Sequence, residues 1–179
     1  MRKIIYNKFD KHDITALPKV LFSGRIIVIN TAAEAEKAVD YLMSQKILGI
    51  DTETRPSFKK GQTHNVALLQ VSTHDTCFLF RLNLTGITPA IIRLLEDPSI
   101  PKIGLSLRDD INSLHKRADF HPGNFIDLQK HVCELGVEDL SLQKLYANFF
   151  HQKISKSVRL SNCLATDRNY MPPPMRGHV

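Results

Sequence analysis

Three short apolar segments lie close together in the first half of the chain, and they constrain the fold more than any other feature. Residues 47–51, 66–72 and 77–82 have the length and the β-branched and aromatic content of buried strands. The last two are separated only by a short turn at residues 73–75, and strands joined in this way pair antiparallel. We therefore expect a meander of three strands.

Strands and helices alternate in the second half of the chain. Thr88 and Pro89 open a helix, with proline at the first helical position, where its missing N–H is not needed. Residues 103–107 form the next predicted strand, residues 108–116 a helix, and residues 125–128 a short fifth strand that leads into further helices. A meander followed by such alternation predicts an α/β fold with a mixed five-stranded sheet and flanking helices.

The segment before the meander has two parts. Residues 1–24 form a polar lead-in, and residues 25–30 are a further candidate strand. Thr31 and Glu34 then stand at the spacing of a capping box, in which each side chain accepts a hydrogen bond from the backbone N–H of the other residue. A helix is therefore expected to begin directly after Thr31.

The composition is that of a single globular domain. The chain has 179 residues, of which 42% are hydrophobic, and no apolar run approaches the roughly 20 residues of a membrane span. The charged N-terminal residues are not typical of a secretory signal, and the cysteines form no C-x-x-C pair. We expect a cytoplasmic protein whose domain spans residues 25–162, after the lead-in at residues 1–24 and before an aberrant, disordered tail at residues 163–179.

Two carboxylates follow the first strand of the meander. Asp51 and Glu53 lie two residues apart, and alternate side chains of an extended strand share a face. Two like charges this close are costly unless a cation or a proton lies between them. Magnesium or manganese is the natural cation for an all-oxygen site. For this pair alone, a solvated strand end is the simpler interpretation.

A second acidic pair, Asp109 and Asp110, follows the predicted strand at residues 103–107. Aspartate is common at a helix N-terminus, so this pair alone indicates little. Carboxylates at the ends of two strands can nevertheless converge on one metal cluster, in which two ions activate water and stabilise the leaving oxygen of phosphodiester cleavage. Asp127 also ends a predicted strand, and an ordinary helix cap is the simpler role for it.

Together these features resemble a known family. The segment GIDTET, the hairpin VALLQVSTHDTCFLF and the G-x5-D spacing of KIGLSLRDD, in that order, resemble 3′→5′ exonucleases of the DEDD class, in particular the ribonuclease D and Werner-type branch. The resemblance covers residues 25–162. It implies a ribonuclease H-like fold, hydrolysis at the 3′ ends of nucleic acids, and two Mg²⁺ or Mn²⁺ ions. Asp51 and Glu53 match the first motif and Asp110, spaced from Gly104, the second; these three are the catalytic and metal-binding residues that it implies.

The third motif of this family departs from its usual pattern here. The family has Y-x-x-x-D, whose aspartate completes the metal site and whose tyrosine orients the attacking water. In this chain Tyr170 is followed four positions later by Pro174, and consecutive prolines cannot continue a helix. The resemblance therefore implies an impaired activity.

Two interpretations of this end of the chain are open. The first is a shifted reading frame, in which each codon takes the third base of one present codon and the first two bases of the next. The junction of Met171 and Pro172 then gives GCC, which encodes alanine. From Tyr170 onward, one reading that this frame allows is Y-A-A-T-D-A. A small deletion near codons 162–163 that also shifted the frame would explain the tail. Alternatively, C-L-A-T-D from Cys163 to Asp167 replaces the motif in frame, with Asp167 as the fourth ligand.

Basic and aromatic side chains near the motifs are candidates for nucleic-acid contact. Lysine and arginine bind phosphates without sequence preference, and phenylalanine can stack on a terminal base. A solvated loop position is an equally good interpretation of each. The candidates are Arg55, Phe58, Lys59, Lys60, Lys153 and Lys156. The net charge of +6 suits a polyanionic partner.

The sequence therefore favours a metal-dependent 3′→5′ exonuclease that is impaired by the loss of its third motif. The alternative is a non-catalytic nucleic-acid-binding module of the same fold. DNA and RNA offer the same phosphodiester group, so neither is favoured as substrate. No membrane partner is predicted, and no feature of the sequence indicates an oligomeric state.

Overall fold

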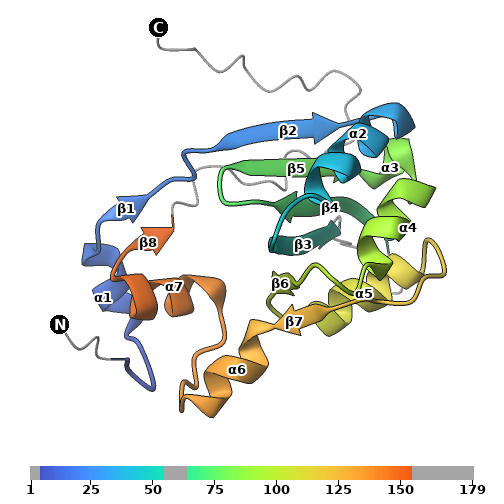
Figure 1. Ribbon diagram of the computed structural model, residues 1–179. Coiled ribbons are helices and arrows are strands. Elements are labelled where there is room, and N and C mark those ends of the chain that lie inside the picture. Colours follow the sequence, from blue (N-terminus) through green and yellow to red (C-terminus); the bar gives the residue numbers. More distant parts are fainter. Residues whose placement is uncertain (1–4, 55–63, 155–179) are drawn as a thin grey trace, which may run out of the picture.

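Residues 5–54 and 64–154 are described by a computed structural model (Figure 1). The strands are β1 (Lys19–Val20), β2 (Arg25–Ile29), β3 (Leu48–Thr54), β4 (Val66–Ser72), β5 (Thr76–Arg81), β6 (Lys102–Gly104), β7 (Phe125–Asp127) and β8 (Lys153–Ile154). The helices are α1 (Lys11–Ala16), α2 (Ala32–Leu42), α3 (Leu82–Thr85), α4 (Pro89–Glu96), α5 (Leu107–His115), α6 (Leu128–Glu134) and α7 (Leu142–Phe150). None of these helices has the length and apolar character that crossing a membrane requires.

The main sheet contains six strands in the described residues, not the five that were predicted. Their order is β2-β5-β4-β3-β6-β7. The predicted meander of β3, β4 and β5 is antiparallel, whereas β2, β6 and β7 each pair with a neighbour in parallel. The additional strand is β2, which pairs with β5 from Arg25 opposite Thr76 to Ile29 opposite Phe80. Its partner is distant in the sequence, so local patterns do not reveal the pairing.

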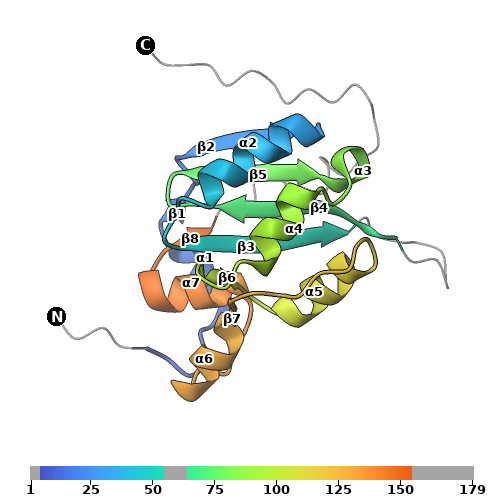
Figure 2. The same ribbon diagram turned by 45° about the vertical axis from the view of Figure 1, so that its right-hand side comes forward.

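Helices α2 and α4 cover one face of this sheet (Figure 2). Helix α2 begins with the predicted capping box, since the Thr31 hydroxyl accepts from the Glu34 N–H and the Glu34 carboxylate accepts from the Thr31 N–H. Helix α4 begins with Pro89 at its first position and Thr88 as its cap. The core between these helices and the sheet includes Val39, Leu42, Leu48, Leu69, Val71, Phe80, Ile91, Leu94 and Leu95, all of which are buried.

Strand β6 is shorter than the predicted strand at residues 103–107. It ends at Gly104 because Ser106 adopts a left-handed backbone conformation, with φ of 58°, and α5 begins at Leu107. Gly104 lies close to the neighbouring strand: a Cβ atom on it would be 2.5 Å from the Ile50 carbonyl oxygen. A residue without a side chain therefore allows β6 to approach β3 while the chain turns directly into α5.

Part of the polar lead-in forms regular structure. Helix α1 and strand β1 lie beside α7 and β8 at one side of the molecule (Figure 1). Strand β1 pairs with β8 in parallel, with Lys19 opposite Lys153 and Val20 opposite Ile154. The predicted tail at residues 163–179 lies outside the described residues.

The substitution Gly104→Ala is expected to destabilise the fold. The added methyl group meets the backbone of β3 and the side chain of Leu107, and overpacking of this kind costs roughly 1–3 kcal/mol. Denaturant unfolding of the two proteins measures the difference. Lys130→Ala, at an exposed position of α6, is the control and should change the free energy of unfolding by less than about 0.5 kcal/mol. An equally small effect of Gly104→Ala would contradict the close approach.

Candidate active site

Three acidic residues lie near one another where β3 ends and α5 begins. The parallel register of β3 and β6 places Leu48 opposite Lys102 and Gly49 opposite Ile103, so the carboxyl ends of both strands lie at the same edge. Asp51 and Glu53 lie in the last part of β3, and Asp110 lies in the first turn of α5. The neighbouring Asp109 is exposed, whereas Asp110 is half-buried.

The electrostatics of these groups show that they interact. Desolvation, followed by the charge of Asp110, raises the pKa of Asp51 to about 6, and Glu53 contributes to the same shift. Desolvation and the charge of Asp110 likewise raise the pKa of Glu53. The pKa of Asp110 is also raised, mainly by desolvation. Such a group of carboxylates favours a bound proton or a cation.

Thr52 connects two of these carboxylates. Its backbone N–H donates to Asp51 Oδ1 at 2.9 Å, and its hydroxyl donates to Asp110 Oδ1. The residue therefore holds the first acidic pair and the α5 helix in a common arrangement. No sequence pattern points to Thr52, because strand alternation assigns it to the face opposite its two acidic neighbours and its partner Asp110 is remote in the chain.

Asp127 is a helix cap, as its simpler interpretation predicted, and it serves two helices. Its Oδ1 accepts from the Gln129 N–H at 3.0 Å, which caps α6. The same carboxylate accepts from the Ser106 N–H at 3.2 Å and from the Leu107 N–H at 3.1 Å, at the start of α5. Asp127 thus fixes the left-handed turn from which the helix carrying Asp110 begins.

An open cavity of about 820 Å³ lies beside β3. Asp51 lines it together with residues of β4, β5 and β6 and the segment from α6 to the start of α7. Leu142 starts α7 and is 55% exposed, because it faces this cavity. The lining residues include Ile47, Gly49, Gln70, Ser72, His74, Cys77, Ile103, Ser106, Leu128, Gln129, Leu140, Ser141 and Leu142.

The donor chemistry of this site suits a hard divalent cation, because all three groups are carboxylates that repel one another. Within residues 5–54 and 64–154, however, no three His, Cys, Asp or Glu side chains are arranged so that they could hold a metal ion as they stand. Further side-chain adjustment, or further ligands, would be needed. The third-motif candidates Asp167 and Tyr170 lie outside the described residues.

Most of the predicted nucleic-acid contacts also lie outside the described part of the chain, namely Arg55, Phe58, Lys59, Lys60 and Lys156. Lys153 is described. It lies in β8, and its ammonium group donates to the Thr15 backbone carbonyl. The structure therefore ties Lys153 to the N-terminal segment, and its contact with nucleic acid stays a prediction.

Comparison with known proteins places these features in a family. A family model described as "3'-5' exonuclease" matches residues 26–172. The bifunctional 3'-5' exonuclease/ATP-dependent helicase WRN of Mus musculus is 28% identical over 159 residues, which are 82% of this chain and 11% of that protein. The chain thus spans about a tenth of the length of this relative.

Solved structures share the fold. The crystal structure of the Aedes aegypti Nibbler EXO domain superposes with a TM-score of 0.69 at 17% identity, and covers 82% of this chain and 77% of that one. The crystal structure of Trypanosoma brucei RNase D in complex with RNA U12 gives a TM-score of 0.61 at 21% identity. The match covers 70% of this chain and 47% of that one. The predicted ribonuclease H-like α/β fold is confirmed. On the family match over residues 26–172, the chain belongs to the DEDD-class 3′-5′ exonuclease family.

Proposed function

We propose that this chain is a metal-dependent exonuclease domain that hydrolyses phosphodiester bonds at the 3′ ends of nucleic acids, and that its altered third motif impairs the reaction. The observation that supports the proposal is the electrostatic interaction of Asp51, Glu53 and Asp110, the first of which lines an open cavity. Raised pKa values, a polar turn fixed by Asp127, and family membership support it.

Asp51, Glu53 and Asp110 would hold two Mg²⁺ or Mn²⁺ ions. When bound, such ions supply positive charge that stabilises the negative charge developing on the phosphate and leaving oxygens in the transition state of phosphodiester hydrolysis. Thr52 would keep Asp51 and Asp110 in place through its N–H and hydroxyl, and Asp127 would hold the first turn of α5. These are positioning roles, which act through the carboxylates.

The cavity would receive the terminal nucleotide. Leu128 and Leu142 offer apolar surface for a base or a sugar, while Gln70 and Ser72 offer hydrogen-bonding groups, and Asp51 adjoins them. A relative of similar fold has been solved with RNA, which favours RNA as one substrate to test beside DNA. The candidate contacts with nucleic acid remain Arg55, Phe58, Lys59, Lys60, Lys153 and Lys156. A cytoplasmic location remains an expectation from the sequence.

The alternative is a module that binds nucleic acid without cleaving it. The unusual residues at the third motif favour this alternative, because a catalytic set that lacks one member commonly loses orders of magnitude in rate. The family match extends to residue 172 and so includes Asp167, which keeps the in-frame motif at Cys163 to Asp167 as a second interpretation.

In the absence of metal, Asp51→Asn is expected to stabilise the protein at high pH. The pKa of Asp51 is raised from its ordinary 3.8 to about 6, so the folded protein keeps a proton that the unfolded chain releases in this window. Above pH 6 the ionised Asp51 carboxylate therefore destabilises the folded state. Below pH 3.8 the carboxyl group is protonated in both states, and this destabilisation disappears. With EDTA present, the variant should melt a few degrees higher than the wild type at about pH 8 and at nearly the same temperature at about pH 3.

Equal melting temperatures across this whole range would contradict the raised pKa of Asp51, which desolvation and the neighbouring carboxylates cause. Asp109→Asn is the matched control, because Asp109 is exposed and in the same turn as Asp110. Asp109→Asn should change the melting temperature at about pH 8 less than Asp51→Asn does.

Manganese is expected to raise the melting temperature of the wild type. A cation that binds only the folded state stabilises it by about 2.7 kcal/mol at one hundred times its dissociation constant, which corresponds to several degrees. Asp51→Asn should remove most of this gain, and Asp109→Asn should retain it. Thermal melts with millimolar MnCl₂ and with EDTA measure the effect; a wild type that is indifferent to manganese would count against the site.

The chain as it stands is expected to shorten 5′-labelled oligonucleotides only very slowly. A version with the frame restored, which continues through Y-A-A-T-D-A, should digest them in the 3′→5′ direction with Mg²⁺ or Mn²⁺, faster by orders of magnitude. A ladder assay on DNA and RNA strands compares the two proteins. Asp51→Asn in each controls for contaminating nuclease.

Asp167→Asn distinguishes the two interpretations of the third motif. If the original chain digests the strands as fast as the restored one, and Asp167→Asn abolishes this activity, then Asp167 completes the site in frame and the frame-shift hypothesis is wrong.

A further inference from the structure

The N-terminal residues 5–20 pack against α7, although the family match begins only at residue 26. Phe9 and Ile14 are buried against Ala147 of α7, and Leu17 packs beside them. These contacts form a small core that is separate from the core under α2 and α4. We call residues 5–20 the N-terminal brace.

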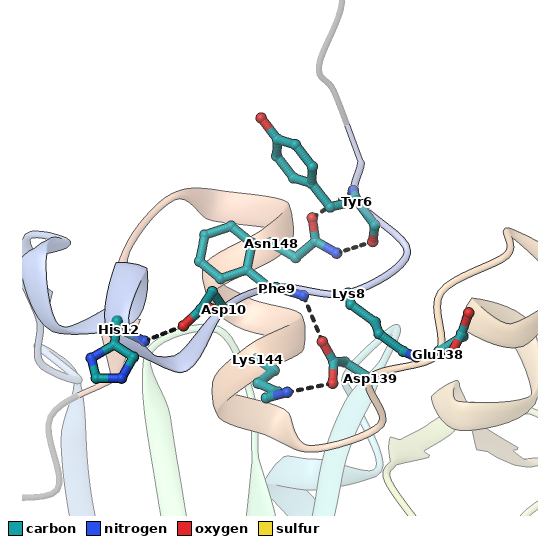
Figure 3. Close-up of polar contacts among 9 residues, drawn as sticks. All are labelled: Tyr6, Lys8, Phe9, Asp10, His12, Glu138, Asp139, Lys144 and Asn148. Atoms are coloured by element: carbon teal, nitrogen blue, oxygen red, sulfur yellow. Dashed lines mark hydrogen bonds and ion pairs between the residues drawn. The ribbon is translucent and has the colours of Figure 1, made fainter.

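We call residues 138–142, which lead into α7, the turn. One set of polar contacts joins the brace to this turn (Figure 3). The Phe9 backbone N–H donates to Asp139 Oδ2 at 2.6 Å, and the Glu138 backbone N–H donates to the Asn7 carbonyl at 2.9 Å. The other oxygen of Asp139 accepts from the Lys144 ammonium at 2.6 Å. The Asp139 side chain is only 13% exposed, so the carboxylate links the brace, the turn and α7 at a largely desolvated point.

A second set fixes the brace along α7 itself. Asn148 is 1% exposed, and both ends of its amide pair with the backbone of one brace residue. The Tyr6 N–H donates to Asn148 Oδ1 at 2.9 Å, and Asn148 Nδ2 donates to the Tyr6 carbonyl at 2.6 Å (Figure 3). A buried amide that lost these partners would be left unsatisfied, so the brace and α7 are bound as one unit.

The turn that the brace holds also forms one wall of the cavity beside Asp51. Leu140, Ser141 and Leu142 line this cavity, directly after Glu138 and Asp139 in the chain. The Leu140 carbonyl accepts from Gln129 Nε2 of α6 at 3.2 Å, and Gln129 lines the cavity too. The turn therefore contacts the N-terminal brace on one side and the cavity on the other.

We propose that the N-terminal brace is a positioning element of the active site: through Asp139 and Asn148 it holds residues 138–142 as a wall of the cavity and thereby sets the affinity for a nucleic-acid 3′ end. The second part of this inference rests on the proposed function. Residues 5–20 act through the turn and do not touch the acidic group.

Asp139→Ala and Asn148→Ala in the full chain test the brace. Hydrogen exchange should become roughly tenfold faster or more for amides of residues 138–148 and unchanged for amides of β3 and β4, because only the small core is loosened. Lys8→Ala is the matched control. It removes an ion pair of the same segment, with Glu138 at 2.8 Å, whose side chains are 73% and 58% exposed, and it should leave the exchange unchanged. Unchanged exchange in both test variants would contradict the inference that residues 5–20 hold residues 138–142 in place and would overturn the proposal.

Binding of a 5′-labelled single strand with manganese tests the role of the wall. The dissociation constant should rise about tenfold in Asp139→Ala, while the thermal response to manganese stays that of the wild type, since Asp51, Glu53 and Asp110 are untouched. Faster exchange with an unchanged dissociation constant would show that the brace serves stability alone, which overturns the proposal. A wild type that binds no strand would overturn the proposed function and with it the role of the wall, and the exchange data would still decide whether the brace exists.

Discussion

The parallel pairing of β3 with β6 is the constraint on which the candidate site depends. Only this register brings the end of β3, with Asp51 and Glu53, beside the start of α5, with Asp110. The pairing is secured at its other end by Lys102, which is fully buried. Its ammonium donates to the Asp97 and Ile100 carbonyls at 2.7 and 2.9 Å and lies 5.4 Å from the centre of the Phe125 ring. A buried charge that is satisfied in this way leaves β6 little freedom to change register.

The acidic residues of the candidate site lower the free energy of unfolding when they are ionised. Three carboxylates with raised pKa values lie close together, and nothing in the described residues neutralises them. Thr52 compensates locally, because it donates to both Asp51 and Asp110. Asp127 caps both α5 and α6, but its own charge raises the pKa of Asp110 further. These bonds fix where the charges lie without removing the repulsion. Such an arrangement is typical of a site that is completed by something it binds.

Local patterns in the sequence predicted the parts of the fold whose causes are local. The capping box of Thr31 and Glu34, Pro89 at the start of α4, and the meander each depend on a few neighbouring residues. The contacts that were not predicted join remote segments. Strand β2 pairs with β5, Thr52 bonds to Asp110, and Tyr6 bonds to Asn148, and neither periodicity nor residue type indicates these partners. The polar character of residues 1–24 hid the brace, because most of its bonds use backbone groups.

The charge distribution separates the two functions considered for this fold. The chain carries a net charge of +6, which suits a polyanion, yet Asp51 lines the cavity and no lysine or arginine among the described residues does. A phosphodiester brought to Asp51 would meet negative charge, so binding there is favourable only after protonation or with a cation between them. Cation and nucleic acid must then increase each other's affinity by the same factor. A module that binds nucleic acid without metal would gain nothing from these carboxylates and would be weakened by them, whether or not the third motif is complete.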